Sequence, residues 1–335
     1  KDQKGLIKIG NERVVDARLS DAEFFWNKDK TQNLVKKVSE LKSMNFFKAL
    51  GSYFEKVQRM RKLGAMVSDE LLISKEKVEL SASICKTDLT SDLVGEFPEL
   101  QGIMGGYFAS HQGFDKDISL AITEQYLPIG LDSRVPKKAF SVALSLIDKI
   151  DTLVGFFGVN EKPSSSKDPF ALRRIALGII RTIIENKKDF KISDLLSYCS
   201  NLYQDQGLIL TNKDLQKDLN NFLKDRFRYY MREKQIRFDI IDASLSSFSL
   251  NKLFSTFEKA KSLNKIINNQ VGQDITSSYK RASNILVSEL KSNGLEITNT
   301  TDPEIFKTDF EKNLFKKIGE IKKYFSSINN DENYE

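Results

Sequence analysis

The segment PSSSKDPFALRR, residues 163–174, brings together three serines, a lysine and the start of a helix, which are ingredients of a phosphate-binding loop. A nucleotide-binding P-loop requires GxxxxGK followed by Ser or Thr, because its glycines let backbone amides close around the phosphates. This segment contains no glycine. Asp168 followed by Pro169 predicts instead a helix that begins at Pro169, with the Asp168 carboxylate on its first amides. A carboxylate there also repels a phosphate, so a nucleotide cradle is disfavoured.

The helix predicted after Pro169 carries a basic stripe. Arg174, Gly178, Arg181 and Glu185 fall on one helical face. A glycine in the middle of such a stripe would let a phosphate backbone or another helix come close. A solvated face with an Arg181–Glu185 pair fits the same spacing, and both interpretations stay open at this point.

Asp148 and Asp151 are three residues apart in IDKIDTLVGFF, so they share a helix face with Ser145 and Thr152. Paired carboxylates can bind a metal ion or act as acid and base. The chain has a single histidine, His111, in the polar segment ASHQGFD, where we expect a solvent-exposed loop. Because histidine-dependent hydrolases need well-placed histidines, a structural polar stripe is favoured over a metal site, and contacts with basic neighbours are a further alternative.

A second basic region is DLQKDLNNFLKDRFRYYMREKQIR, residues 214–237. Its arginines are interleaved with Tyr229 and Tyr230, a combination that suits RNA because guanidinium groups bind phosphates and aromatic rings stack on bases. An ordinary surface helix fits equally well. In SSYKRASNILVSELK, Lys280 and Arg281 precede an apolar face, and the spacing predicts an amphipathic helix.

The elements that position these residues are predicted to be helical. With 17 glycines and 6 prolines in 335 residues, the chain has too few turn formers for a β-sandwich or barrel, so the fold class is all-α. GIMGGYFA is too irregular for a dinucleotide-binding loop and predicts close helix–helix packing. Apolar spacing predicts a short strand over 6–9, helices over 35–63, 79–96 and 117–127, and a buried central helix over 139–157.

The composition limits the function classes further. Lys and Arg outnumber Asp and Glu by 52 to 46, an excess that is compatible with a polyanionic partner but does not prove one. Cys85 and Cys199 lack metal-ligand spacing, which indicates a reducing compartment. The sequence has no export signal and no apolar run of about 18 residues, so we expect a cytoplasmic location and no membrane contact.

Five stretches resemble a known family, in order and at sensible spacing. They are GNERVVDARLSDAEFFW, KTDLTSDLVGEFPELQGIMGGYFA, EQYLP, DKIDTLVGFFGVNEKPSSSKDPFALRRIALGIIR and YKRASNIL. Together they are similar to the β subunit of the bacterial heterotetrameric glycyl-tRNA synthetase. The resemblance runs from the start of the chain to about residue 290, and the block around residues 163–174 is its most specific part.

The resemblance implies a division of labour in an α2β2 assembly. The α subunit would activate glycine with ATP, and the β subunit would bind tRNA and be required for aminoacylation. We therefore expect a fragment of the β subunit that lacks the N-terminal domains and the C-terminal end, with no catalytic residue, cofactor or metal of its own. The implied organisation is a connecting segment over 1–36, an HD-like helical domain over 37–188, a helical connector over 189–250 and part of an anticodon-binding helical domain over 251–335.

The implied HD-like domain looks degenerate. Active HD domains bind metal through His and Asp, whereas here Lys86 and Asp88 take the place of the His-Asp pair and Asp148 or Asp151 that of the final aspartate. A lysine in place of a ligand puts a fixed cation where the metal would sit, and Lys86 could pair with Asp148 or Asp151. The domain is therefore predicted to be a catalytically inactive scaffold.

The predicted function is to hold and position tRNA(Gly) for glycylation at the α subunit. One alternative is a metal-dependent phosphohydrolase that uses Asp88, Asp148 and Asp151, and another is a module that only assembles the subunits. Binding to tRNA should weaken steeply with salt if it depends on phosphate contacts. The predicted tRNA contacts are Arg173, Arg174, Arg181, Arg226, Arg228, Arg232, Lys280 and Arg281.

Overall fold

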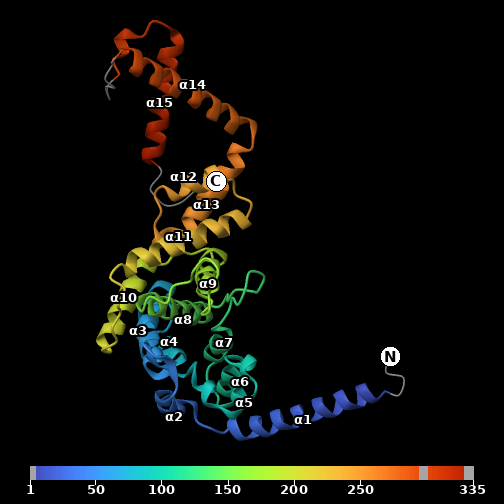
Figure 1. Cartoon of the computed structure of the whole chain (residues 1–335). Helices are drawn as coiled ribbons and strands as arrows, with labels where there is room; N and C mark the ends of the chain where they lie inside the picture. The colour runs from blue at the N-terminus through green and yellow to red at the C-terminus, as the bar shows by residue number, and fades with distance from the viewer. Residues whose placement is uncertain (1–4, 294–300, 328–335) are drawn as a thin grey trace. The chain divides into compact units, whose positions relative to one another are not determined.

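The computed structural model describes residues 5–293 and 301–327, which form fifteen α-helices, five short 3-10 helices and one two-stranded hairpin (Figure 1). The all-α prediction is confirmed. The contacts divide the described chain into two units, the first made of residues up to 235 together with 245–254. The second unit contains 236–244 and the residues from 255 on. The four-part division drawn from the resemblance stays a prediction.

The first helix, α1 (Leu6–Asp29), includes the residues for which a short strand was expected, so that expectation is wrong. In the part of the chain that the structure describes, no strand pairs with residues 6–9, and the Lys8–Glu12 pair at i, i+4 favours the helix. The last turns of α1 place Trp26 against Phe108, with ring centroids 5.5 Å apart. His111 is exposed as predicted, but it ends a helix, α6 (Ile103–His111), and its ring edge meets Trp26.

The continuous helix expected over 35–63 is broken into short elements before one long helix. The elements are α2 (Leu34–Lys37), η1 (Val38–Ser43), β1 (Asn45–Phe47), β2 (Gly51–Ser52) and α3 (Tyr53–Leu71). Two local features cause the break. Gly51 adopts a positive φ of 78°, and Ser52 forms a capping box with Glu55 that starts α3.

The helix expected over 79–96 also divides. It becomes α4 (Lys75–Ile84), η2 (Thr87–Thr90) and α5 (Asp92–Glu96), because the Ser91 hydroxyl accepts the Val94 amide and begins a new helix. Pro98 lies just beyond α5, at the start of η3 (Pro98–Leu100). This break places Lys86 between two helices, where its side chain can turn into the interior.

The centre of the first unit is α8 (Ala139–Gly158), which is buried along nearly its whole length, as predicted. It packs against α3, α7 (Lys116–Glu124), α9 (Leu172–Glu185), α10 (Ile192–Asp205) and α11 (Leu215–Glu233). The predicted close packing at GIMGG is confirmed. A Cβ on Gly106 of α6 would lie 2.7 Å from the Ser119 carbonyl oxygen of α7.

The remaining helices follow α11. They are α12 (Phe238–Leu245), η4 (Leu250–Lys252), α13 (Leu253–Ile267), α14 (Gln270–Asn293), η5 (Pro303–Ile305) and α15 (Asp309–Ser327). In the second unit, α14 and α15 leave large apolar side chains such as Tyr279 and Phe310 exposed. Within the described ranges, no helix combines the length and the hydropathy needed to cross a membrane.

Candidate functional site

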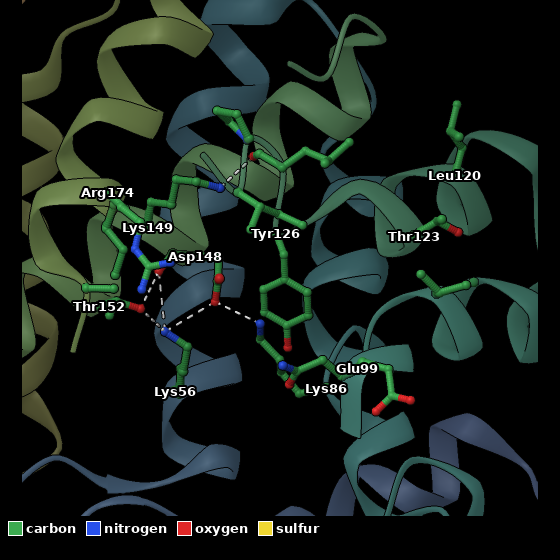
Figure 2. Close-up of a pocket in the computed structure, with 18 of the residues that line it drawn as sticks. Lys56, Lys86, Glu99, Leu120, Thr123, Tyr126, Asp148, Lys149, Thr152 and Arg174 are labelled. Carbon is green, nitrogen blue, oxygen red and sulfur yellow. Dashed lines mark hydrogen bonds and ion pairs between the residues drawn. The ribbon is translucent and has the colours of Figure 1, made fainter. Parts of the chain in front are cut away.

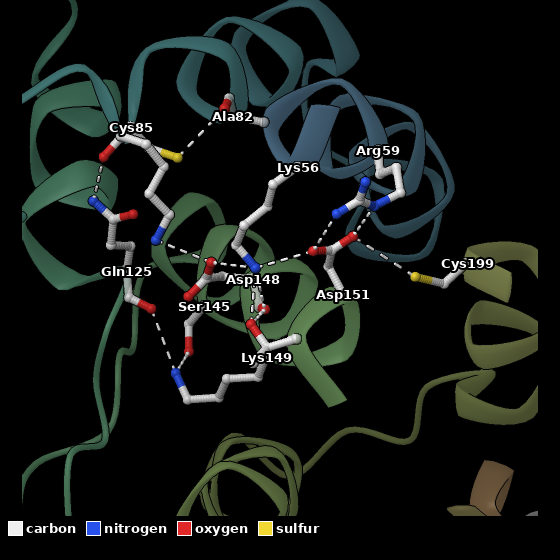
Figure 3. A network of polar contacts seen from close by, with 12 residues as sticks. Lys56, Arg59, Ala82, Cys85, Gln125, Ser145, Asp148, Lys149, Asp151 and Cys199 are labelled. Atoms are coloured by element: carbon white, nitrogen blue, oxygen red, sulfur yellow. Dashed lines mark hydrogen bonds and ion pairs between the residues drawn. The ribbon is translucent and has the colours of Figure 1, made fainter. Parts of the chain in front are cut away.

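The predicted polar stripe of α8 meets a set of cations in the interior of the first unit. Lys56 and Arg59 come from α3 and are one helical turn apart, so both reach the same face of α8. Lys86 comes from the break after α4. With Asp148 and Asp151 they form a buried group that we call the cation–carboxylate cluster. Figure 3 shows Lys56 between the two carboxylates, with Arg59 beyond Asp151.

Asp148 is neutralised by two lysines. The Nζ of Lys86 lies 2.9 Å from Asp148 Oδ1, and the Nζ of Lys56 lies 3.3 Å from the same oxygen. Burial alone would raise the pKa of Asp148, but the two ammonium groups hold it well below its usual value. The pairing of Lys86 with one of the two α8 aspartates is therefore confirmed, and its partner is Asp148.

Asp151 is held more tightly still. Arg59 donates from Nε at 2.6 Å to Asp151 Oδ1 and from Nη2 at 3.2 Å to Oδ2, while Lys56 donates at 3.0 Å. Burial opposes ionisation here, and the Arg59 and Lys56 charges outweigh it, so the pKa of Asp151 is lowered. The Tyr203 ring lies 3.7 Å from the Arg59 guanidinium carbon. Both carboxylate oxygens of Asp151 therefore already accept hydrogen bonds from buried cations.

Asp88 does not join this group. Its Oδ2 accepts hydrogen bonds from the Gly102 and Gly105 amides at the start of α6, and its buried Oδ1 has no hydrogen-bond partner among the described residues. Burial raises the pKa of Asp88 to about 6, against the lowering effect of the amides and Lys86. Of the three carboxylates named for a phosphohydrolase, Asp148 and Asp151 are bridged by Lys56, whereas Asp88 is held apart by the backbone amides.

The donor set does not fit a divalent metal ion. In residues 5–293 and 301–327, no group of three or more His, Cys, Asp and Glu side chains is arranged to hold one. Lys86 and Lys56 lie against the Asp148 oxygen that a metal would use. A hydrolase built on Asp88, Asp148 and Asp151 would have to displace both ammonium groups first.

A pocket of about 910 Å³ opens beside the cation–carboxylate cluster, and we call it the cluster pocket. Lys56, Lys86 and Asp148 line one end, together with Arg174 from α9, and Leu120 and Thr123 of α7 lie at the opposite end (Figure 2).

Lys149 lines the polar end of the cluster pocket as well. It donates to the Leu127 carbonyl at 2.6 Å and to Ser145 Oγ at 2.9 Å. Burial, together with the Lys86 and Lys56 charges, lowers the pKa of Lys149 to about 7. Lys149 is therefore a buried amine that gains or loses a proton near neutral pH.

The segment that begins α9 differs from its predicted form. Pro169 lies in a turn, and the helix starts at Leu172, three residues later than expected. Asp168 still caps it, because its carboxylate accepts the amides of Leu172 and Arg173 at 2.8 and 3.0 Å. The predicted role of Asp168 at the helix mouth is confirmed, although the helix does not begin at Pro169.

The three arginines predicted on α9 lie in different surroundings. Arg174 is exposed at the cluster pocket, and Arg173 is half-buried and donates to the Ser164 carbonyl. Arg181 is buried and donates to Glu185 at 2.8 Å and to the Ser133 carbonyl at 2.8 Å. The stripe is therefore not a free basic face. The alternative, a solvated face with an Arg181–Glu185 pair, is right only in the pair, because Arg181 itself is buried.

The glycine of that stripe is also covered. A Cβ on Gly178 would lie 2.9 Å from Cε of Lys149, so the Lys149 side chain occupies the space in which a phosphate backbone was expected to approach. Gly178 is needed for packing between α9 and α8.

The basic residues of α11 are only partly available. Arg232 is exposed, whereas Arg226 and Arg228 are half-buried. The Arg226 guanidinium lies 5.7 Å from the Tyr229 ring centre, and its Nε is buried. In the second unit, Lys280 and Arg281 are exposed on α14.

Sequence reasoning missed Lys56 and Arg59. Both belong to the basic segment KVQRMRK, and charged side chains of this kind are seldom buried, yet Arg59 is fully buried. Their positions alternate with Val57 and Met60, which are also fully buried, and that interleaving was the signal available in the sequence.

Comparisons with known proteins agree on one family. A family model described as glycyl-tRNA synthetase beta subunit matches residues 1–246. The chain is 38% identical over 330 residues to the glycine–tRNA ligase beta subunit of Rickettsia canadensis (strain McKiel), covering 98% of the chain and 47% of that protein. It is 38% identical over 320 residues to that of Paracoccus denitrificans, covering 95% and 45%. The chain thus spans about half the length of the curated relatives it matches.

Proposed function

Since the chain belongs to the glycyl-tRNA synthetase β-subunit family, we propose that it is a non-catalytic, tRNA-holding region used in attaching glycine to tRNA. The observation that carries the non-catalytic part is the cation–carboxylate cluster. Lys86 and Lys56 form ion pairs with Asp148, and Arg59 and Lys56 form ion pairs with Asp151. Carboxylates held in this way support packing and are poorly placed to bind a metal or to move a proton.

If this region is non-catalytic, the attachment of glycine to tRNA must be catalysed by another part of the assembly. In this proposal an α subunit uses ATP to activate glycine, and this region requires no cofactor for that reaction. The assembly would be α2β2 and cytoplasmic. The β-subunit name of the relatives supports association with an α subunit, and the exposed cations of both units support contact with tRNA(Gly).

The structure narrows the choice of residues for a tRNA-binding test. Arg181 is buried and Arg226 has a buried Nε, so replacing either one would disturb folding as well as binding. Arg232, Lys280 and Arg281 are exposed and suit a charge reversal. The triple substitution of these three residues to Glu should weaken binding to tRNA(Gly) and lower the slope of log K against log salt by about 3, or about one per phosphate contact.

The test is a filter-binding titration with tRNA(Gly) and with a non-cognate tRNA at several salt concentrations. The matched control is Lys75→Glu, which reverses an exposed charge in the first turn of α4, where a carboxylate is tolerated. The control should bind as the parent chain does. Equal affinity and equal salt slope in the triple variant and the parent chain would overturn the assignment of these residues.

Subunit assembly is a second candidate because α1 exposes many apolar side chains. Leu6, Ile7, Val14 and Leu19 are each more than 60% exposed. Patches of this kind mark interaction surfaces. Titrating the α subunit and tRNA(Gly) separately against the chain distinguishes the two roles, since an assembly module would bind the α subunit and leave tRNA(Gly) unbound.

A further inference from the structure

The cluster pocket has two chemically different ends. At one end Lys56, Lys86 and Lys149 line the wall with Asp148, and Arg174 stands at the same end in Figure 2. Leu120 of α7 lies at the other end in Figure 2, and Tyr107 of α6 also lines the pocket. Its volume of about 910 Å³ falls in the range of small-molecule sites, about 300–1,000 Å³. A ligand that fills it therefore needs an anionic part and an apolar or aromatic part.

The polar end has more positive than negative charge. In the cation–carboxylate cluster, three cations face two carboxylates, and Arg174 adds a further cation at the opening. Arg134, also on the lining, is paired with buried Glu124, and Asp88 is held by amides away from the lining. Besides Asp148, the pocket lining includes one further acidic residue, Glu99. The excess favours a phosphate, which carries about two negative charges near neutral pH.

Arg174 is placed to meet that phosphate. It is exposed, and among the residues that the structure describes no hydrogen bond or ion pair engages its guanidinium. A guanidinium presents two parallel N–H groups to a phosphate, which makes it the side chain best suited to this group. Its neighbour Arg173, by contrast, already donates to the Ser164 carbonyl.

Tyr107 offers an aromatic surface on the pocket lining. Its side chain is 60% exposed at the pocket, and no ring contact or hydrogen bond engages it in the described part of the chain. It follows Gly106, whose backbone is pressed against Ser119 of α7, so the Tyr107 backbone position is fixed. An exposed aromatic ring on a rigid helix is a stacking platform for a base, whatever the base is.

We propose that the cluster pocket binds a nucleoside monophosphate unit, with the phosphate on Arg174 and the base against Tyr107. The unit can be a free nucleotide or one unpaired nucleotide of an RNA strand, since both present an anionic phosphate and a base. The ligand is bound and not transformed, because the carboxylates of the pocket are already held by cations. This site is independent of tRNA holding through Arg232, Lys280 and Arg281.

The test is isothermal titration calorimetry of the whole chain with AMP, GMP, CMP and UMP in phosphate-free buffer. We expect millimolar or tighter binding of AMP, and binding of adenosine and of inorganic phosphate at least about tenfold weaker, because each lacks one half of the interaction. Arg174→Gln and Tyr107→Ala should each weaken AMP binding about tenfold. Both side chains are exposed, so neither change should affect folding.

The matched control is Arg13→Gln, the same chemical change at an exposed arginine of α1 outside the pocket, and it should bind AMP as the parent chain does. A single-stranded oligonucleotide that displaces AMP would assign the site to RNA, and one that does not would assign it to free nucleotides. Absence of AMP binding at 10 mM, equal binding of adenosine and AMP, or equal binding by Arg174→Gln and the parent chain would each overturn the proposal. None of these results depends on the tRNA(Gly) titration, so the two proposals can fail separately.

Discussion

The Nζ atom of Lys86 lies 2.9 Å from Asp148 Oδ1, with 2% and 10% of the two side chains exposed. Breaking a buried ion pair from one side leaves an uncompensated charge in the interior, which is costly. Lys56 still contacts Asp148 when Lys86 is removed, so the loss is moderated. The pair is therefore a structural element of the first unit, and removing either partner should reveal it.

We expect Lys86→Met to lower the free energy of unfolding of the first unit by about 2–4 kcal/mol. Combining it with Asp148→Asn should cost less than the sum of the two single changes, because the interaction is lost only once. Urea unfolding followed through Trp26, the single tryptophan, reports on this unit. Lys77→Met, which breaks the exposed Lys77–Asp115 pair, is the control and should change stability by less than about 1 kcal/mol. Additive effects of Lys86→Met and Asp148→Asn would contradict the pairing.

The Asp88 carboxyl should give the chain a distinct pH response. Its pKa is raised from 3.8 to about 6 in the folded protein. The folded state therefore binds more protons than the unfolded state between these values, and the contribution of Asp88 to stability falls as pH rises from about 4 to about 6. Asp88→Asn, which keeps an oxygen for the Gly102 and Gly105 amides, removes this response.

The measurement is the difference in unfolding free energy between Asp88→Asn and the parent chain across pH 4 to 8. It should grow in favour of the variant by roughly 2–3 kcal/mol between pH 4 and pH 6 and then level off. The pKa values of Asp148 and Asp151 are lowered, so their contributions to the stability of the fold decrease as the pH falls. Both contributions are present in the variant and in the parent chain, so they cancel in the difference. A difference that does not change with pH would show that Asp88 is ionised normally.

The sequence predicted the fold class and the central helix because long apolar periodicity and scarce turn formers report directly on them. The resemblance predicted that Lys86 pairs with Asp148 or Asp151, through the position of Lys86 in place of a metal ligand, and the partner is Asp148. Periodicity alone does not predict this contact, because the two residues are 62 positions apart, on different elements. Their meeting depends on the break between α4 and η2, which the sequence reading placed inside one helix.

The burial of charged side chains was the feature predicted least well from the sequence. The basic stripe that contains Arg181 was interpreted as solvated or as a close contact, and cations such as Arg59 are in general seldom buried. Both are inside, since Arg181 satisfies loop carbonyls at Gly130 and Ser133 and Arg59 satisfies Asp151. A partner that lies far away in sequence decides whether a cation is buried, and helical spacing carries no information about that partner.

Arg59 and Arg61 of α3 provide a matched pair for testing the cation–carboxylate cluster. Arg59 gives Asp151 two hydrogen bonds from one planar group and lies on the Tyr203 ring, whereas Arg61 is 41% exposed and pairs with Glu79 at 3.7 Å. A lysine cannot reproduce the planar, two-point contact. Arg59→Lys should lower the melting temperature by several degrees, at a cost of about 2–3 kcal/mol, and Arg61→Lys should leave it within about 1 °C. Equal melting temperatures for the two variants would contradict a structural role for the planar group.

Gly155 and Gly95 allow a test of how closely α8 is packed. A Cβ at Gly155 would lie 2.9 Å from Leu50 Cδ1 and closer still to the Tyr203 hydroxyl, whereas a Cβ at Gly95 of α5 meets nothing within 4 Å. Alanine is favoured over glycine in a helix by up to about 1 kcal/mol, so Gly95→Ala should be neutral or stabilising. Gly155→Ala should cost about 1–2 kcal/mol net, because overpacking outweighs the helix preference and pushes Tyr203 away from Asp151. In urea titrations followed through Trp26, Gly155→Ala should therefore lower the free energy of unfolding, whereas Gly95→Ala should leave it unchanged or raise it. Stabilisation by Gly155→Ala would show that α8 and α10 are not in close contact at this point.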